Sequence, residues 1–308
     1  MREGVSSVAE VLASKDHLGE TPLWCEKTGK LWWIDIEKPS VQCLHSETGK
    51  HSVFHIDSNY VGSLALTDTN CLLIATDLTL ALFDPRSGRV QPIAQVDDGL
   101  DNRINDGRAD AKGRFWTGTL DNQLSRPNGS IYRLETDGTV TKLLDDVIVT
   151  NGIVHSPDGR TFYFTDTRRF TTWAFDIDPD DGAITNRRVF ADHTAARERP
   201  DGACIDVDGC IWQAFFSGSQ IVRYQPNGTI DRRIELPVTN PTCVCFGGKE
   251  LRTLYVTSGC KFLSQQQLDN EPMAGSLFAI EGLGQGLPEH RVSVTGYAGS
   301  LISDFPES

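Results

Sequence analysis

Four polar residues stand at matching positions in the repeats of this sequence. They are Glu20, Asn105, Asn151 and Asp201. The last three each precede the glycine of a later turn by eight residues, and Glu20 precedes its turn glycine by nine. This shared spacing predicts that the four side chains lie at one structural level and face a common site.

Oxygen atoms that converge in this way indicate a cation site. Two carboxylates and two amide oxygens meeting at one point would be destabilised by repulsion and desolvation if left bare. A divalent cation removes both penalties, and an all-oxygen set suits Ca²⁺, Mg²⁺ or Mn²⁺ better than structural zinc. Two other repeats carry Gly62 and Val244 at this position, so only four repeats contribute oxygens. Taken singly, each residue also fits a solvated loop or a local Asx turn.

The elements that must position these residues recur at near-constant spacing. Six turns, each followed by an aromatic or aliphatic strand, are spaced 41 to 50 residues apart and contain Gly29, Asn70, Gly113, Gly159, Gly209 and Arg252. Each repeat continues into further strands that alternate polar and apolar residues. Six units of about 45 residues with four strands each predict an all-β, six-bladed β-propeller. An array of β-sandwiches or two smaller barrels is the alternative.

We expect residues 1–308 to form a single propeller domain, because one blade cannot bury both faces of its own sheet and a closed ring can. The ring must close on itself. The N-terminal strand near SSVAEVLA is expected to pair with the last blade, alongside HRVSVTGY.

Composition limits the partners and the compartment. The 308 residues have a net charge of −13, which argues against nucleic acid and anionic membranes as partners. No apolar run approaches the roughly 18 residues that span a bilayer, and the N-terminus lacks the apolar core of a signal peptide. The eight cysteines form no CxxC pair and several lie in apolar runs. We therefore expect reduced, buried thiols and a cytoplasmic protein.

Four sequence segments carry a family resemblance. They are LGETPLW, NRINDGRAD with GRFWTGT, TNGIVHSPDGRTFYFTDT and RPDGACIDVDG. Together and in this order they resemble the SMP30/gluconolactonase/regucalcin-like family of six-bladed propellers, over roughly residues 8 to 300. Thr21 departs from the family pattern, which often has glycine there, and Asp121 is shorter than the glutamate of some relatives.

The resemblance implies both a site and an activity. It implies one divalent metal held by Glu20, Asn151 and Asp201, with Ca²⁺ as the first choice and Zn²⁺, Mn²⁺, Mg²⁺ or Fe²⁺ as alternatives. Asn105 would touch the metal or the substrate. Arg103 and Asp121 would line the substrate pocket. Family members hydrolyse lactones of sugar acids such as glucono-, galactono-, xylono- or arabinonolactone.

These expectations combine into a mechanism with Asp201 as general base. The metal would polarise the lactone carbonyl as a Lewis acid, and Asp201 would activate the attacking water. Arg103 and Asn105 would hold ring hydroxyls or the oxyanion, and Asp121 would accept a hydrogen bond from the sugar. The alternatives are a phosphotriesterase-like hydrolase on the same site and a calcium-binding regulatory or scaffold propeller. We expect a small-molecule substrate and a monomer or weak oligomer.

Overall fold

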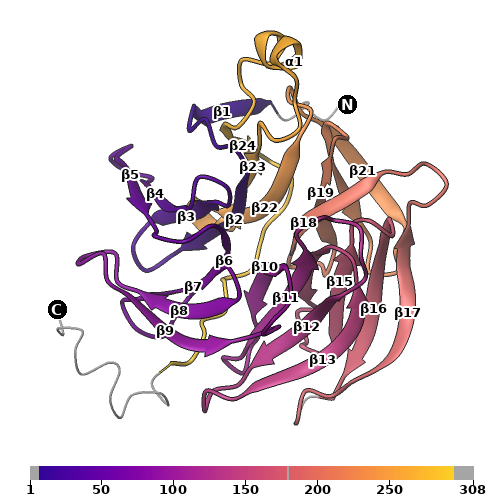
Figure 1. The fold of residues 1–308 in the computed structure, drawn as a ribbon. Helices are drawn as coiled ribbons and strands as arrows, with labels where there is room; N and C mark the ends of the chain where they lie inside the picture. The colour runs from indigo at the N-terminus through magenta and orange to yellow at the C-terminus, as the bar shows by residue number, and fades with distance from the viewer. Residues whose placement is uncertain (1–6, 179, 295–308) are drawn as a thin grey trace.

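Six four-stranded antiparallel sheets surround a common axis in the computed structural model, which describes residues 7–178 and 180–294 (Figure 1). The first strands of the sheets contact one another around this axis. The prediction of an all-β, six-bladed propeller is confirmed.

Five of the sheets each use four strands that follow one another in the chain. The first sheet contains β2 (Gly19–Cys25), β3 (Lys30–Asp35), β4 (Ser40–His45) and β5 (His51–His55). The second contains β6 (Val61–Leu66), β7 (Leu72–Thr76), β8 (Thr79–Phe83) and β9 (Val90–Gln95). The third contains β10 (Asn102–Ala109), β11 (Phe115–Asp121), β12 (Gly129–Leu134) and β13 (Val140–Val147). The fourth contains β14 (Thr150–His155), β15 (Thr161–Asp166), β16 (Thr171–Ile177) and β17 (Ile184–Asp192). The fifth contains β18 (Arg199–Ile205), β19 (Ile211–Phe216), β20 (Gln220–Tyr224) and β21 (Ile230–Glu235).

The sixth sheet joins the first strand of the chain to its last three. Three of its strands are β22 (Pro241–Gly247), β23 (Thr253–Ser258) and β24 (Leu277–Glu281), with the short helices η1 (Lys249–Leu251) and α1 (Gln265–Asn270) in its connections. The fourth is β1 (Val8–Leu12), which pairs antiparallel with β24. In Figure 1 the indigo β1 lies beside the orange β24. The ring is therefore closed by backbone hydrogen bonds between segments far apart in the sequence.

The expected neighbour of the N-terminal strand was wrong. HRVSVTGY does not lie alongside β1, because the preceding segment Leu277–Glu281 already occupies that position. In the described part of HRVSVTGY, Val292 instead forms a parallel bridge with Thr67 of the second blade. Residues 295–297 of this stretch lie outside the described residues. The described part of HRVSVTGY therefore packs against the second blade and does not extend the last one.

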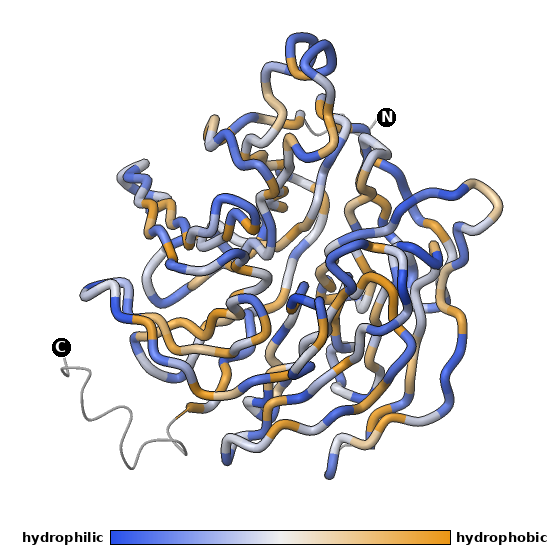
Figure 2. The backbone as a smooth tube through the Cα atoms, in the orientation of Figure 1, coloured by the Kyte–Doolittle hydropathy of each residue, from blue (hydrophilic) through white to orange (hydrophobic). Residues whose placement is uncertain are grey.

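Burial changes systematically across each blade. The first strands β6 and β22 are buried along their whole length, whereas the outer strand β21 is mostly exposed. The largest side chains fill the spaces between sheets, and Trp33, Trp116 and Trp212 are fully buried. Hydrophobic residues follow the strands, and hydrophilic residues gather at many of the connections (Figure 2). The first strands are therefore held rigidly on both faces, which makes them suitable supports for a site.

The eight thiols are all unpaired, and seven of them are buried; Cys260 is half-buried. In residues 7–178 and 180–294, no helix has the length and apolar character needed to cross a membrane.

Candidate functional site

A cavity of about 390 Å³ lies where several first strands begin. Its lining includes five of the six residues that the sequence singled out: Glu20, Arg103, Asn105, Asn151 and Asp201. Each of the five is at most 7% exposed. They come from β2, β10, β14 and β18, so four different blades contribute to one hollow. The shared spacing in the sequence therefore corresponds to a shared level in the fold.

A repeated irregularity in the first strands aims these side chains. β2, β10, β14 and β18 each contain one extra residue relative to their partner strand, close to the candidate residue. The residue that follows the candidate has a positive φ in three of them: 47° at Thr21, 57° at Asp106 and 56° at Gly152. Such bulges bend a strand and redirect its side chains. The bulge therefore lies beside the candidate residue in each of these four blades.

Thr21 is strained at its bulge. A β-branched residue with a φ of 47° is an outlier, and the buried Oγ1 of Thr21 has no hydrogen-bond partner among the described residues. We expect Thr21→Gly to raise the free energy of unfolding by about 1 kcal/mol, because it relieves both penalties. Denaturant titration measures this.

Thr21→Ala separates the two causes, since it removes the hydroxyl and keeps the strained φ. The strain explanation fails if Thr21→Gly is no more stable than Thr21→Ala.

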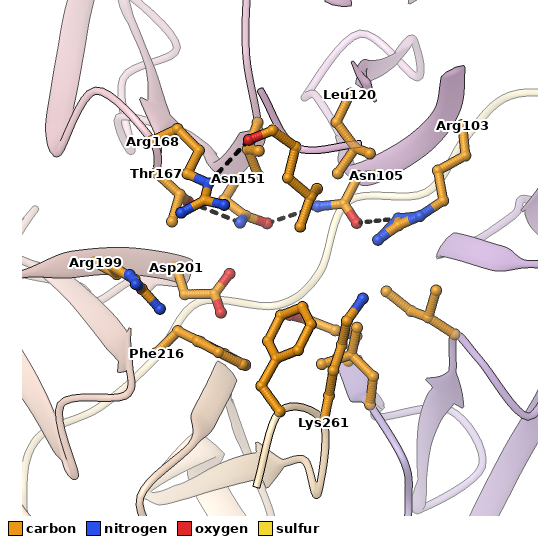
Figure 3. Close-up of a pocket in the computed structure, with 16 residues that line it drawn as sticks. Arg103, Asn105, Leu120, Asn151, Thr167, Arg168, Arg199, Asp201, Phe216 and Lys261 are labelled. Carbon is orange, nitrogen blue, oxygen red and sulfur yellow. Dashed lines mark hydrogen bonds between the residues drawn. The ribbon is translucent and has the colours of Figure 1, made fainter. Parts of the chain in front are cut away.

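A row of hydrogen bonds joins the third and fourth blades on one wall of the cavity (Figure 3). Arg103 Nη1 donates to Asn105 Oδ1 at 3.1 Å, and Asn105 Nδ2 donates to Asn151 Oδ1 at 2.9 Å. Asn151 Nδ2 in turn donates to Thr167 Oγ1 at 2.9 Å. Every amide in the row thus has a defined orientation, which leaves the oxygens of Asn105 and Asn151 each with one accepted bond and further acceptor capacity.

The two carboxylates of the cavity, unlike the amides, can change their charge, and the pKa of each is raised. Burial raises the pKa of Glu20, and the nearby charge of Asp106 adds to this. Burial also raises the pKa of Asp201, and the charges of Glu20 and Asp106 raise it further. Asp106 itself accepts hydrogen bonds from the backbone N–H groups of Gly107 and Ile153, so it supports the bulge beneath the cavity. Three buried acids are therefore held close enough to repel one another.

The donor set fits a hard divalent cation. Glu20 Oε2 accepts one bond, from the N–H of Thr21 at 3.0 Å, and no ion pair joins Glu20 or Asp201 to a cationic side chain within the described ranges. No group of three or more His, Cys, Asp and Glu side chains in these ranges is arranged to hold a metal. A cation here would therefore need the amide oxygen of Asn151 beside the two carboxylates. Such an all-oxygen set suits Ca²⁺, Mg²⁺ or Mn²⁺.

Asp121 does not lie where the sequence placed it. It is fully buried, and it is not among the residues that line the cavity. Its carboxylate accepts hydrogen bonds from the Arg126 side chain and from the backbone N–H groups of Ser125 and Arg126. These contacts hold the pKa of Asp121 far below its usual range. Asp121 shapes the loop after β11, and the nearby Leu120 and Leu124 face the cavity instead.

Sequence reasoning missed other residues that line the cavity. They include Thr167, Arg168, Arg199, Phe216, Lys261 and Phe262. Phe262 is 68% exposed and has a φ of 64°, both unusual for a large apolar side chain. These residues lie in connections or at the ends of strands, away from the shared offset, so no common spacing marks them in the sequence.

Comparison with known proteins shows the family of the chain. A family model described as the SMP-30/Gluconolactonase/LRE-like region matches residues 18–260. The chain belongs to this family. The match includes the motifs of the first five blades and the start of the sixth, and it confirms the resemblance drawn from the sequence.

Individual members of the SMP-30/gluconolactonase family match over nearly the whole chain. Regucalcin of Gallus gallus is 36% identical over 281 residues, covering 89% of this chain and 94% of the relative. A 6-deoxy-6-sulfogluconolactonase of Pseudomonas putida is 32% identical over 287 residues, covering 93% and 95%. The crystal structure of a calcium-binding regucalcin from Agrobacterium tumefaciens superposes with a TM-score of 0.87 at 32% identity, covering 93% of this chain and 98% of that one.

Proposed function

We propose that this protein is a metal-dependent hydrolase that opens the lactone ring of a sugar acid to give the free aldonate. The observation that carries the proposal is the pair of buried carboxylates, Glu20 and Asp201, facing one cavity from different blades. Buried like charges are costly unless a cation or a reaction uses them. The sulfogluconolactonase among the relatives supports the lactone as substrate.

Glu20, Asn151 and Asp201 would hold the cation. A divalent cation held there supplies Lewis-acid polarisation of the lactone carbonyl. Asp201 accepts the proton of the attacking water, because its carboxylate faces the cavity and forms no ion pair with a cationic side chain in the described part of the chain (Figure 3). Arg103 and Asn105 present N–H groups and an amide oxygen on the facing wall, where they orient ring hydroxyls or the developing oxyanion.

The apolar lining completes the site. Leu18, Ile36, Leu120 and Val149 face the same cavity, and Phe216 and Phe262 pack edge to face with ring centroids 6.2 Å apart. These side chains provide an apolar surface for the carbon face of a sugar ring.

Removal and replacement of the metal tests the proposal. Thorough chelation is expected to abolish hydrolysis of a panel of aldonolactones, and re-addition of Ca²⁺, Mn²⁺, Zn²⁺ or Mg²⁺ one at a time is expected to restore it to different degrees. Rates above spontaneous hydrolysis are measured by proton release at fixed pH. Activity that survives complete chelation contradicts the metal dependence.

The same experiment separates the alternative functions. An organophosphate triester in the panel reports the phosphotriesterase-like alternative. A protein that binds Ca²⁺ in calorimetry but hydrolyses neither class of substrate would instead fit a calcium-binding regulatory or scaffold propeller.

A further inference from the structure

The cavity contains more positive charge than the hydrolysis of a neutral lactone requires. Four cationic side chains line it: Arg103, Arg168, Arg199 and Lys261. They come from different blades, in a protein whose net charge is −13. The two acids of the lining, Glu20 and Asp201, would be neutralised by the proposed cation. The four cationic side chains would then give the cavity walls an excess of positive charge.

Two of these cations are already engaged within the protein. Lys261 Nζ forms an ion pair with Glu37. Arg103 is buried, bonded to Asn105 Oδ1 and placed over the ring of Tyr60 at 5.1 Å. Both therefore have a local reason for their position.

Arg168 and Arg199 have fewer partners within the protein. Neither forms an ion pair with a carboxylate in residues 7–178 and 180–294. Arg168 donates from Nε to Leu124 O at 3.1 Å, which orients the guanidinium and leaves its two terminal nitrogens available. Arg199 donates no side-chain hydrogen bond to another described residue and is half-buried.

Several arginines outside the cavity have partners of their own, which are carboxylates or, for Arg187 and Arg197, an aromatic ring. Arg169, the residue after Arg168, pairs with both Asp166 and Asp146. Arg126 pairs with Asp121 at 2.7 Å. With acidic side chains this abundant, arginines that remain unpaired at a cavity wall point to a ligand that supplies the missing negative charge.

We propose that the substrate is a lactone that carries a separate anionic group, a carboxylate, sulfonate or phosphate, and that Arg168 and Arg199 bind this group. The proposal rests on the lactonase function proposed above and adds a substrate class to it. In Figure 3 both arginines lie on the same side of the cavity as Asp201 and Asn151, away from Arg103. A substrate would thus place its ring between Asp201 and Arg103 and its anionic group towards Arg168 and Arg199.

The chemistry of the two side chains suits this role. The planar guanidinium fork bonds two oxygens of a carboxylate, sulfonate or phosphate at once, and the bonds are charge-assisted. The acidic surface repels anions at long range, but physiological salt screens charges beyond about 8 Å. At the cavity wall the two arginines therefore act on a bound anion at short range.

Kinetics with matched substrates tests the assignment. The substrates are gluconolactone, its phosphate ester at the terminal carbon, the corresponding sulfonate, and glucarolactone for the carboxylate. We expect the wild-type enzyme to show a higher kcat/KM for at least one anionic lactone than for gluconolactone. Arg168→Gln and Arg199→Gln are each expected to lower this anionic-to-neutral ratio about tenfold, mostly through KM.

Arg187→Gln is the matched control. Arg187 is an exposed arginine on the outer strand β17, over the ring of Trp173, and its loss should leave the ratio unchanged. A wild-type ratio below one, or a ratio that Arg168→Gln and Arg199→Gln leave unchanged, overturns the inference.

A binding measurement keeps the inference testable without turnover. Calorimetry compares gluconate with its terminal phosphate ester, which differ by one anionic group. We expect the phosphate ester to bind more tightly, and the double variant Arg168→Gln/Arg199→Gln to lose this difference. If no lactone is hydrolysed but this difference is observed, the proposed function fails and the anion site stands. Equal binding of the two acids by wild-type protein overturns the anion site whatever the activity.

Discussion

Asp201→Asn is expected to reduce lactone turnover by at least about 1000-fold while the propeller stays folded. Asp201 is the proposed base and metal ligand, and its carboxylate is 5% exposed at the cavity wall. Asparagine keeps the shape but accepts no proton from water. Steady-state kinetics with gluconolactone or an anionic lactone measures the loss, and calorimetry is expected to show weaker binding of the added cation.

The same substitution is expected to stabilise the metal-free protein. Asp201 is buried near Glu20 and Asp106, and their charges raise its pKa. Replacing it with a neutral amide removes like-charge repulsion, which should raise the free energy of unfolding without metal by about 1 kcal/mol. A structural residue would give the opposite result, so the sign of this change distinguishes a functional carboxylate from a structural one.

Asp208→Asn provides the control for Asp201→Asn. Asp208 lies in the turn between β18 and β19 of the same blade, its side chain is 73% exposed, and it pairs with Arg223. Its replacement should change neither activity nor stability measurably. Near wild-type kcat in Asp201→Asn would show that another group activates the water.

Gly62→Ala is expected to destabilise the propeller by about 3 kcal/mol or more. A Cβ at Gly62 would lie 1.9 Å from Ile104 O and 2.7 Å from Ile104 C. These are backbone atoms of the buried strand β10, so they cannot move aside as a flexible side chain would. Urea or thermal unfolding measures the loss.

This substitution should also affect the site. Ile104 stands between Arg103 and Asn105, so a displaced β10 would break the hydrogen-bond row at its origin. We expect kcat/KM to fall in whatever fraction remains folded. Gly284→Ala is the matched control, because its added Cβ would meet only Phe246 Cζ at 4.0 Å. Equal stability of the two variants would contradict the close approach of β6 and β10.

Gly62 also explains why the second blade adds no oxygen to the site. Its position corresponds to that of Asn105 in the repeat, but the close contact with Ile104 leaves no room for any side chain. Val244, at the same position in the sixth blade, is fully buried in the apolar core. Two blades therefore contribute no oxygen to the site. A side chain is sterically excluded at Gly62 in the second blade, and Val244 packs in the apolar core of the sixth.

Regular spacing in the sequence made the propeller and four polar residues of the site predictable. Turns that recur every 41 to 50 residues encode six equivalent blades, and a fixed offset from those turns encodes a fixed height along the axis. Glu20, Asn105, Asn151 and Asp201 could be found in this way because local backbone periodicity controls their position. Their convergence on one cavity follows from closing identical units around one axis.

Features without such periodicity required the folded chain. The partner of β1, the inward or outward direction of Asp121, and the approach of Arg168 and Arg199 to the cavity depend on contacts between residues far apart in the chain. Asp121 shows the reason most clearly: the same carboxylate could face a sugar or an arginine, and Arg126 five residues later provides the stronger partner. Local patterns specify which strand a residue occupies, whereas the direction and charge environment of a loop side chain are decided by the neighbours that tertiary packing brings to it.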